Sequence, residues 1–347
     1  MLVVKKFGGS SVADRERIMN VARRCIEDYE KGNDVVVVLS AMGKTTDGLL
    51  EKAREITETP SKRELDMLLV TGEQVSVALM AMAFQSLGVQ AVSLNAAQVA
   101  MRTTSAYGQA KLKRIDTERI RNELDARKIV VITGFQGINK YDDMTTLGRG
   151  GSDTTAVALA VALHADFCEI YTDVDGVYTA DPRIVPNAKK LSEVSYDEML
   201  EFASLGAKVL HNRSVEMAKR YGVKLVVLSS LTRAEGTIIK EKTSMEKMLV
   251  SGVAADKNTA RISVLGVKDE PGIAFRLFNL LARYRINVDI IIQSVGRDNR
   301  KDISFTVART DLQETMKIIN DHLEMLTADS VSADDTVAKI SIIGAGM

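Results

Sequence analysis

Two glycine-rich turns in the sequence have residue types that suit the binding of a phosphate group. The first, Lys5-Lys6-Phe7-Gly8-Gly9-Ser10-Ser11, follows a short apolar stretch and precedes a helical pattern. Adjacent glycines let the backbone approach an anion, helix N-terminal N–H groups add partial positive charge, and a lysine adds a full charge. Gly-Gly alone is equally typical of a tight strand-to-helix turn. A second such turn, Gly148-Arg149-Gly150-Gly151-Ser152-Asp153, again just before a helical pattern, favours the anion site.

Two familiar nucleotide-binding motifs are absent. The segment Ser40-Ala41-Met42-Gly43-Lys44-Thr45-Thr46-Asp47 contains Gly-Lys-Thr, but Val38 stands where a P-loop needs its first glycine. No GxGxxG follows the first predicted strand, which argues against a dinucleotide-binding oxidoreductase. The remaining signal is a set of loops with small, hydroxylated and charged residues. Loop residues of this kind contribute to function more often than to core packing.

The elements that position these loops alternate between strands and helices over the first two thirds of the chain. Between most of the predicted strands the apolar residues recur every three to four positions, as in residues 14–31, where Gly32 marks the helix end. This alternation predicts an α/β fold with a largely parallel sheet between helices, and ligands at the carboxyl ends of the strands. The predicted strands are residues 2–4, 35–39, 89–94, 129–133, 167–172 and 224–228.

Composition excludes several classes of function. The chain has 347 residues, 46% of them hydrophobic, which favours two or three well-packed domains. Lys+Arg and Asp+Glu each number 46, so no basic excess favours nucleic acid as a partner. Cys25 and Cys168 lie in apolar surroundings and, with three histidines and no CxxC, they predict buried thiols rather than a metal site or disulfide.

The sequence shows no segment that we interpret as a membrane span. Only four apolar residues, Met1 to Val4, precede Lys5, too few for a signal peptide. The run that we take as the longest uncharged apolar one, residues 154–163, is too short to cross a bilayer. We therefore expect a cytoplasmic protein without a membrane partner.

The C-terminal third contains an internal repeat. The sequence from Ala260 to Val267 recurs from Ala338 to Ala345. After the first copy, the pattern predicts a helix over 273–284, strands over 286–293 and 302–308, and a helix over 312–323. The second copy stops at Met347, and one strand cannot bury a hydrophobic face alone. We expect this second unit to be incomplete or to be completed by a partner.

Six motifs together closely resemble the aspartate kinases (aspartokinases) of the amino acid kinase superfamily. They are Lys6-Phe-Gly-Gly-Ser-Ser11, Ser40-Ala-Met-Gly-x-Thr-Thr-Asp47, Thr71-Gly-Glu73, Gly134-Phe-Gln-Gly137, Thr146-Leu-Gly-Arg-Gly-Gly-Ser-Asp153 and Thr172-Asp-Val-Asp-Gly-Val-Tyr-Thr-Ala-Asp-Pro-Arg183. The C-terminal repeat resembles the paired ACT regulatory domains of that family. The motifs run in order along the whole chain, which makes the series specific where each single motif would be weak.

The resemblance implies a three-layer αβα amino acid kinase fold followed by a ferredoxin-like βαββαβ ACT domain. It predicts a catalytic domain over 1–240, a linker and a strand of the second ACT unit over 241–259, the first ACT domain over 260–333, and the first strand of an incomplete second ACT domain over 334–347. The implied activity is ATP-dependent phosphorylation of the β-carboxylate of L-aspartate, the first step toward lysine, threonine, methionine and diaminopimelate.

The family's substrate and catalytic residues map onto the glycine turns and the loops beside them. Phosphoryl transfer needs alignment of two anions and neutralisation of spread charge, and Lys6 is the cation that the resemblance implies. Lys5 is interpreted as a solvated lysine at the strand end. The resemblance places Arg149 on the α-carboxylate of aspartate and Glu73 and Asp153 near its ammonium, with Asp153 also in the catalytic set. Hydroxyl contacts come from Ser40, Thr46 and Ser152.

Simpler interpretations of these acids stay open on spacing alone. Glu73 could cap the helix that runs on through Val75, and Asp153 could be a first-turn carboxylate that the helix dipole favours.

The nucleotide site is implied by the same turns and by the last motif. The residues that match the family's ATP contacts are Lys6, Gly8, Gly9, Ser10, Thr172, Asp173, Tyr178, Asp181, Arg183 and Lys208. A plain alternative is that Asp173 and Asp175 end a strand in a turn. Mg2+ is expected on ATP oxygens, water and one carboxylate, so no protein metal site is expected.

The regulatory half is implied by the ACT resemblance. Asp269, Pro271, Gly272 and Ile273 match the loop where the first repeat meets a lysine or threonine effector, although Asp-Glu-Pro-Gly is also typical of an ordinary turn. In the family the first ACT unit is inserted within the second, so residues 248–254 should supply a strand to the unit that begins at Ala338. Because this sequence lacks the helices and remaining strands of the second unit, we expect weak or absent feedback inhibition and an exposed apolar edge. Members of the family commonly dimerise through their ACT domains, so the resemblance implies a homo-oligomer.

Two other functions remain to be separated from aspartate kinase. A sibling kinase for glutamate, acetylglutamate or a nucleotide would keep the fold but would not predict residues 149–153 together with an ACT-like tail. A catalytically silent amino-acid sensor on a kinase scaffold is disfavoured because Lys6, Glu73, Arg149 and Asp153 are all present.

Overall fold

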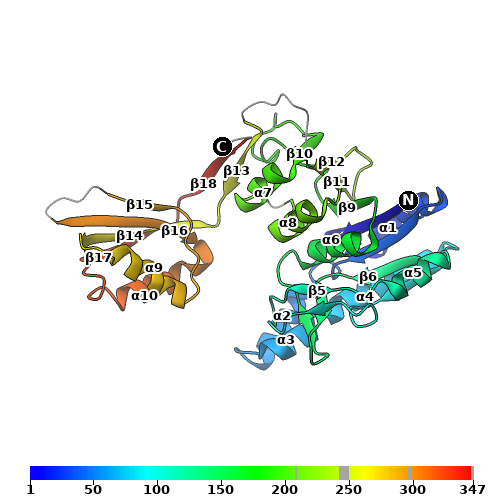
Figure 1. Cartoon of the computed structure of the whole chain (residues 1–347), viewed down its shortest axis with the longest axis horizontal. Coiled ribbons are helices and arrows are strands. Elements are labelled where there is room, and N and C mark those ends of the chain that lie inside the picture. The colour runs from blue at the N-terminus through cyan, green and yellow to red at the C-terminus, as the bar shows by residue number, and fades with distance from the viewer. Residues whose placement is uncertain (208, 242–249, 295–298, 345–347) are drawn as a thin grey trace. The chain divides into compact units, whose positions relative to one another are not determined.

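The computed structural model describes residues 1–207, 209–241, 250–294 and 299–344. Its contacts divide the chain into two compact units, one of Met1–Gly252 with the end of the chain from Ile343, and one of Val253–Ile342. Figure 1 shows the elements of each unit.

An eight-stranded sheet forms the centre of the first unit, in the order β10-β12-β11-β9-β1-β2-β6-β3. Neighbouring strands of this sheet are parallel except β11 with β12. The predicted mainly parallel sheet is therefore confirmed. The strands are β1 Leu2–Phe7, β2 Asp34–Leu39, β3 Ala91–Leu94, β6 Ile129–Thr133, β9 Phe167–Thr172, β10 Glu193–Ser195, β11 Leu225–Ser229 and β12 Thr237–Lys240.

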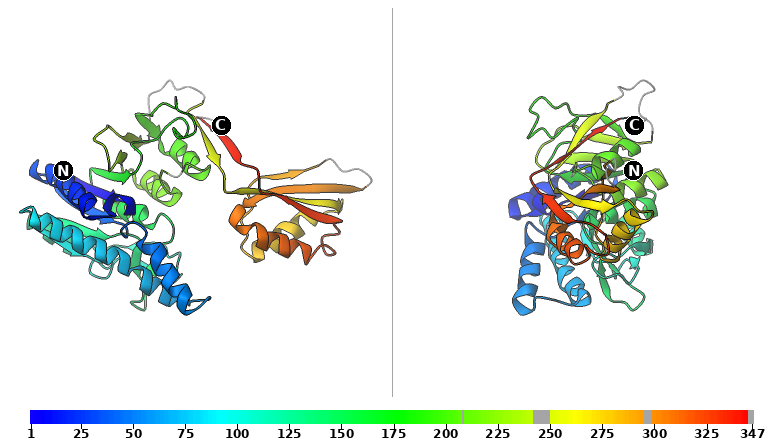
Figure 2. Two further views of the ribbon diagram at one scale, coloured as in Figure 1. Left: turned by 180° about the vertical axis from the view of Figure 1, so that it is seen from behind. Right: turned by 90° about the vertical axis from the view of Figure 1, so that its left-hand side faces the viewer.

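Helices cover both faces of this sheet, as the αβα fold requires (Figure 1, Figure 2). On one face, Cys25 of α1 and Phe84 of α4 pack with Val37 of β2 in a single buried cluster. On the other face, α6 contacts β1, β2 and β9, and α8 packs on α6. The helices are α1 Arg15–Glu30, α2 Thr45–Ile56, α3 Lys62–Leu69, α4 Thr71–Ser86, α5 Glu118–Asp125, α6 Gly151–Leu163, α7 Tyr196–Ser204 and α8 Asn212–Tyr221, with a short 3-10 helix at Gly9–Val12.

A small second sheet, in the order β5-β4-β7-β8, was not predicted from the sequence. Its strands are two or three residues long, too short to show a periodic pattern. Glycine at position 137 lets strands β4 and β7 lie close together, because a Cβ there would lie 2.3 Å from the Thr103 side chain. The sheet matters because β8 leads directly into the second glycine turn. The strands are β4 Arg102–Thr103, β5 Leu112–Arg114, β7 Gln136–Ile138 and β8 Met144–Thr146.

The second unit has the ferredoxin-like arrangement that the ACT resemblance implies. Its sheet has the order β15-β16-β14-β17, and buried residues of α9 and α10 pack on β14 and β16 in one core. Strand β15 is shorter than the predicted 286–293. The elements are β14 Thr259–Lys268, α9 Ile273–Arg283, β15 Ile291–Gln293, β16 Arg300–Ala308, a 3-10 turn at Arg309–Asp311, α10 Leu312–Asn320 and β17 Ser330–Asp334.

Two further strands form a separate two-stranded sheet, β13 Gly252–Asp256 and β18 Lys339–Ile343. A strand from the segment 248–254 was expected to pair with the second repeat, and β13 does so from Gly252 onward, while residues 248 and 249 lie outside the described part. Ile340 and Ile342 of β18 are 71% and 58% exposed, as expected for an apolar edge.

Within the described residues, one helical stretch is long and apolar enough to cross a membrane by length and composition, Lys62–Ser86. It is longer than residues 154–163, so the expectation that 154–163 is the longest apolar run was wrong. More than half of its most apolar window, 56%, is buried inside the unit. The stretch also carries two buried carboxylates, Asp66 and Glu73, so it has the character of a core helix pair.

Candidate active site

The alternation of side chains along β1 separates two adjacent lysines. Lys5 faces α1, because it contacts Asp28 of that helix, whereas Lys6 faces α6 and pairs with Asp153 in its first turn. The Lys6 Nζ lies 2.6 Å from Asp153 Oδ1, and both side chains are only 12% exposed. The structure therefore joins the two glycine turns through an ion pair at the carboxyl edge of the sheet.

Glycine at position 9 permits the loops after β1 and β2 to touch. A Cβ on Gly9 would lie 2.5 Å from the carbonyl oxygen of Ala41, closer than any side chain can approach. Gly43 N–H donates to the Gly9 carbonyl at 2.9 Å, and Ser40 N–H donates to the Phe7 carbonyl at 3.2 Å. The first glycine turn is thus fixed against the loop that carries Ser40.

The loop after β2 is in turn joined to the second glycine turn. Ser40 Oγ donates to Ser152 Oγ at 2.9 Å. Gly134, after β6, leaves room for Ser152, because a Cβ at that position would lie 2.6 Å from its Oγ. Thr46 is half-buried in the first turn of α2. Three loops and the start of α6 therefore converge around Ser40, Ser152 and Lys6.

Glu73, in the first turn of α4, is buried and has one free oxygen among the described residues. Its Oε1 accepts the N–H of Ala41 at 3.0 Å, whereas Oε2 is buried without a hydrogen-bond partner. Burial raises the pKa of Glu73 to about 7, against the smaller opposing effect of the Ala41 N–H. A helix-capping role would not account for a buried oxygen left open to a donor.

Arg149 is exposed between two glycines that both have positive φ, Gly148 at 76° and Gly150 at 69°. These values suit glycine and let the chain turn sharply into α6. Gly150 also has no room for a side chain, since a Cβ there would lie 2.3 Å from His211.

The predicted nucleotide residues begin where β9 ends, beside the first glycine turn. Ser230 links the two, because its N–H donates to the Thr172 carbonyl at 2.9 Å and its Oγ accepts from Ser11 Oγ at 2.8 Å. Thr172 Oγ1 donates to Asp173 at 2.9 Å.

Further along, Tyr178 donates to Asp175 at 2.7 Å, and Arg183 forms an ion pair with Asp181 at 2.9 Å. Gly8 and Ser10 lie in the first turn, where Ser10 is exposed. Lys208 lies outside the described residues.

The predicted effector residues precede α9 in the second unit. Gly272 has φ of 86°, and Asp269 pairs with Lys301 at 2.7 Å. The side chain of Ile273 is only 1% exposed and belongs to the core of this unit, two residues after Pro271. A ligand at this loop would therefore meet the backbone of Ile273 rather than its side chain.

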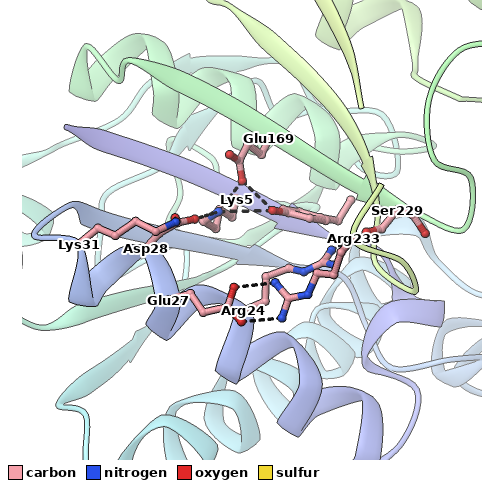
Figure 3. Close-up of polar contacts among 9 residues, drawn as sticks. Lys5, Arg24, Glu27, Asp28, Lys31, Glu169, Ser229 and Arg233 are labelled. Atoms are coloured by element: carbon pink, nitrogen blue, oxygen red, sulfur yellow. Dashed lines mark hydrogen bonds and ion pairs between the residues drawn. The ribbon is translucent and has the colours of Figure 1, made fainter. Parts of the chain in front are cut away.

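The interpretation of Lys5 as a solvated lysine was wrong. Its side chain is 0% exposed and its Nζ lies 2.5 Å from Glu169 Oε2 and 2.6 Å from Asp28 Oδ2, as Figure 3 shows. Burial acts to lower the pKa of Lys5, but Glu169 and the other neighbours outweigh it and raise that pKa. The sequence signal was available, because strand alternation places Lys5 and Lys6 on opposite faces.

Replacing Lys5 by methionine should destabilise the first unit by about 3 kcal/mol, because two partly buried carboxylates would lose their common cation. The matched control is Lys31→Met, which removes an ammonium 2.8 Å from the same Asp28 on a side chain that is 68% exposed. The exposed Lys31–Asp28 pair should contribute less than about 1 kcal/mol to the free energy of unfolding. Urea unfolding of the two variants measures the difference, and equal losses would contradict the burial argument.

The two cysteines are buried thiols, as predicted. Cys25 and Cys168 are both free and 0% exposed. Burial raises the pKa of Cys25 to about 12, so this thiol is not a nucleophile near neutral pH.

Comparison with known proteins agrees with the site. The sequence profile of the amino acid kinase family matches residues 1–229, and that of the ACT domain matches residues 260–324. An aspartokinase of Bacillus sp. (strain MGA3) is 51% identical over all 347 residues of this chain, which cover 84% of that relative. The chain belongs to the aspartokinase family. Among other members, an aspartokinase of Helicobacter pylori (strain J99) is 50% identical and is covered to 86%.

Solved aspartokinase structures share the fold. Aspartokinase III of E. coli in complex with aspartate and ADP has a TM-score of 0.80 and 28% identity, over 99% of this chain and 88% of that one. The aspartate kinase of Synechocystis is 44% identical with a TM-score of 0.65, and this chain covers 60% of its length. The predicted kinase fold with an ACT domain is confirmed, and membership in the aspartokinase family disfavours the sibling-kinase alternative.

Proposed function

We propose that this chain transfers the γ-phosphoryl group of ATP to the β-carboxylate of L-aspartate, forming 4-phospho-L-aspartate and ADP. The observation that carries the proposal is the Lys6–Asp153 ion pair, which joins the two glycine turns at 2.6 Å. This reaction is the first step of lysine, threonine, methionine and diaminopimelate biosynthesis. The reaction class follows from family membership, and the arrangement of the residues supports it.

In the proposed reaction an oxygen of the β-carboxylate attacks the γ-phosphorus while the bond to the β-phosphate oxygen breaks, and ADP leaves with that electron pair. The protein contributes alignment and charge neutralisation. The Lys6 ammonium, next to the Gly8-Gly9 turn, offsets charge on the phosphoryl oxygens, and N–H groups of the turn add to it. Asp153 holds Lys6 in place until the anionic substrates arrive.

Aspartate is oriented by groups of opposite charge. Arg149 presents a planar guanidinium to the α-carboxylate, a pairing that favours two parallel hydrogen bonds. The ammonium of aspartate is a natural donor for the free Oε2 of Glu73, and Asp153 adds a second carboxylate. The hydroxyls of Ser40, Thr46 and Ser152 supply the remaining contacts.

The nucleotide side of the proposal uses the first turn and the segment that follows β9. No three His, Cys, Asp or Glu side chains gather into a metal site among the residues with described positions. We propose that magnesium enters as part of the MgATP substrate, held by ATP oxygens, water and one carboxylate. The proposed contacts are Lys6, Gly8, Gly9, Ser10, Thr172, Asp173, Tyr178, Asp181, Arg183 and Lys208.

The buried Glu73 predicts a pH-dependent affinity for aspartate. Because its pKa in the free protein is about 7, part of the population is protonated near neutrality and must ionise to bind an ammonium. The KM for aspartate should fall about tenfold between about pH 6 and about pH 8, with the ATP KM held nearly constant. Initial rates at several pH values measure this.

The matched control is Glu73→Gln, which keeps the shape but cannot titrate. Its aspartate KM should be higher and nearly independent of pH, and a slope like that of the wild type would show that another group titrates. The same pKa sets the sign for stability. The folded protein binds this proton more tightly than a free carboxyl of pKa 4.5, so the contribution of Glu73 to stability declines as pH rises from about 4.5 through about 7.

The second unit is the proposed regulatory part. E. coli aspartokinase III has been solved in complex with lysine and aspartate. For this chain we place a lysine or threonine effector at the loop of Asp269, Pro271, Gly272 and Ile273. We assign residues 1–240 to catalysis and 260–333 to the first ACT domain, in a cytoplasmic homo-oligomer.

Trapping the acyl phosphate as the hydroxamate tests the activity. We expect hydroxamate formation that depends on both aspartate and ATP, and little with glutamate or acetylglutamate in place of aspartate. A nucleoside monophosphate cannot form a hydroxamate, so ADP release tests that acceptor, and little is expected. Adding lysine or threonine to the same assay tests the effector proposal. Amino-acid binding without turnover would favour the sensor alternative.

A further inference from the structure

A buried carboxylate outside the predicted site holds the base of the second glycine turn. Asp66, on α3, is 1% exposed. Its Oδ2 accepts the N–H of Thr146 at 2.9 Å and its Oδ1 accepts the hydroxyl of the same residue at 2.7 Å. Both oxygens also accept the N–H of Gly108, at 3.1 and 2.9 Å. A buried carboxylate with this many donors is satisfied without a cation.

A guanidinium from the other side holds the next residue. Arg213, on α8, donates from one terminal nitrogen to the Leu147 carbonyl at 2.6 Å and from the other to the Ala110 carbonyl at 3.1 Å. Burial lowers the pKa of Arg213 from its ordinary value, and a guanidinium stays charged in proteins. Each of its two carbonyl acceptors thus receives a charge-assisted hydrogen bond, which is stronger than a neutral one.

These contacts complete the backbone hydrogen bonds of the two residues before the turn. The Thr146 N–H meets Asp66, and the Thr146 carbonyl accepts from Ala110 N–H at 2.9 Å. The Leu147 N–H donates to the Phe135 carbonyl at 2.8 Å, and the Leu147 carbonyl meets Arg213. All four groups are fixed, directly before the glycine at 148.

Glycines on both sides of Arg149 give the turn wide backbone freedom. The Arg149 side chain is exposed. Gly148 packs against the loop at Gly108, where its Cβ position lies 3.0 Å from the Gly108 carbonyl. Asp66 therefore fixes both sides of this contact, the strand end at Thr146 and the loop at Gly108.

We propose that Asp66 and Arg213 are positioning residues that set where the Arg149 guanidinium meets the α-carboxylate of the amino-acid substrate. The inference rests on the proposed function, and it adds two residues to the machinery that the sequence motifs did not contain. A small displacement of a group that orients the substrate lowers the reaction rate, because the reaction depends on alignment of the reacting atoms. Loss of either anchor should therefore weaken aspartate binding while leaving the nucleotide half intact.

The test is a set of double-mutant cycles with Asp66→Asn, Arg213→Lys and Arg149→Lys. Asn at position 66 keeps the volume but offers a single acceptor oxygen. Lys at position 213 brings one nitrogen in place of the two that donate to the Leu147 and Ala110 carbonyls. Each anchor variant should raise the aspartate KM about tenfold and change the ATP KM less than about twofold. In the Arg149→Lys background the same substitutions should add less than about twofold, because they act through Arg149.

The matched control is Arg102→Gln. Arg102 pairs with Asp142 at 2.6 Å at the other end of the same small sheet, and its side chain is 44% exposed. This variant should leave both KM values unchanged. If Asp66→Asn does not fold, Thr146→Val removes only the hydroxyl contact and should shift the aspartate KM in the same direction by a smaller factor.

Three results would overturn the positioning role. The first is an equal effect of an anchor substitution on the KM for aspartate and the KM for ATP. The second is a full effect of the anchor substitutions in the Arg149→Lys background. The third is unchanged hydrogen–deuterium exchange of residues 146–150 in Asp66→Asn, where we expect faster exchange. The exchange measurement needs no turnover. A wild-type protein that forms no hydroxamate with aspartate would therefore defeat the proposed function, while exchange still decides whether the anchors hold the turn.

Discussion

Replacement of Lys6 by methionine should lower kcat by at least about 10²-fold, equivalent to about 3 kcal/mol of transition-state stabilisation. The expectation follows from burial. The Lys6 side chain is only 12% exposed, so its charge acts on a bound phosphoryl group with little screening by water. Methionine has a similar length but no charge, so the variant removes the cation with little change of packing. Steady-state kinetics with saturating aspartate and ATP measure the loss.

The loss should appear in kcat more than in either KM, because charge on the transferring group is greatest in the transition state. Lys52→Met, at an exposed position of α2, is the control for a general effect of removing a lysine. Lys6→Met also leaves Asp153 without its cation, so Lys6→Met with Asp153→Asn should unfold at a higher temperature than Lys6→Met alone while remaining inactive. A Lys6→Met enzyme with normal turnover would remove Lys6 from the mechanism.

The central sheet was predictable because its strands are buried on both faces. Strands such as Val35 to Leu39 and Ile129 to Thr133 are continuous β-branched and aliphatic runs, and they are bounded by turn residues or polar segments. The end of β1 was less predictable. Its pattern predicted a strand end at Val4, whereas parallel pairing with β2 and β9 continues to Phe7. Tertiary pairing extended a strand through two lysines that local propensity would have placed in a loop.

The substrate-facing residues were predictable from motifs, and the residues that hold them were not. Lys6, Arg149 and Asp153 stand in glycine-rich turns that have a recognisable chemistry. Asp66 stands in a helical stretch with other charged residues, and nothing in its neighbours indicates that it meets Thr146 across 80 positions of the chain. Long-range hydrogen bonds of this kind depend on the small sheet, whose strands are too short to leave a sequence pattern.

Replacement of Arg149 by lysine should lower kcat/KM for aspartate about 10- to 100-fold and leave the KM for ATP nearly unchanged. The charge is kept, so the loss measures the planar pair of hydrogen bonds to the α-carboxylate, and hydrogen bonds to charged groups contribute about 1.5–3 kcal/mol. The exposed position of Arg149 places the expected value toward the lower end. Kinetics at varied aspartate and fixed ATP, and the reverse, measure the split.

Arg233→Lys is the matched control, since Arg233 also makes a bidentate pair, with Glu27, on the surface of the same unit. It should change neither KM. The decisive comparison uses a substrate analogue that lacks the α-carboxylate. If Arg149 binds that group, the wild type and Arg149→Lys should use the analogue with similar, low efficiency, because the contact has been removed from both sides. If the wild type used the analogue far more efficiently than Arg149→Lys does, Arg149 would act on another part of the substrate. Binding of the α-carboxylate could then not be its role.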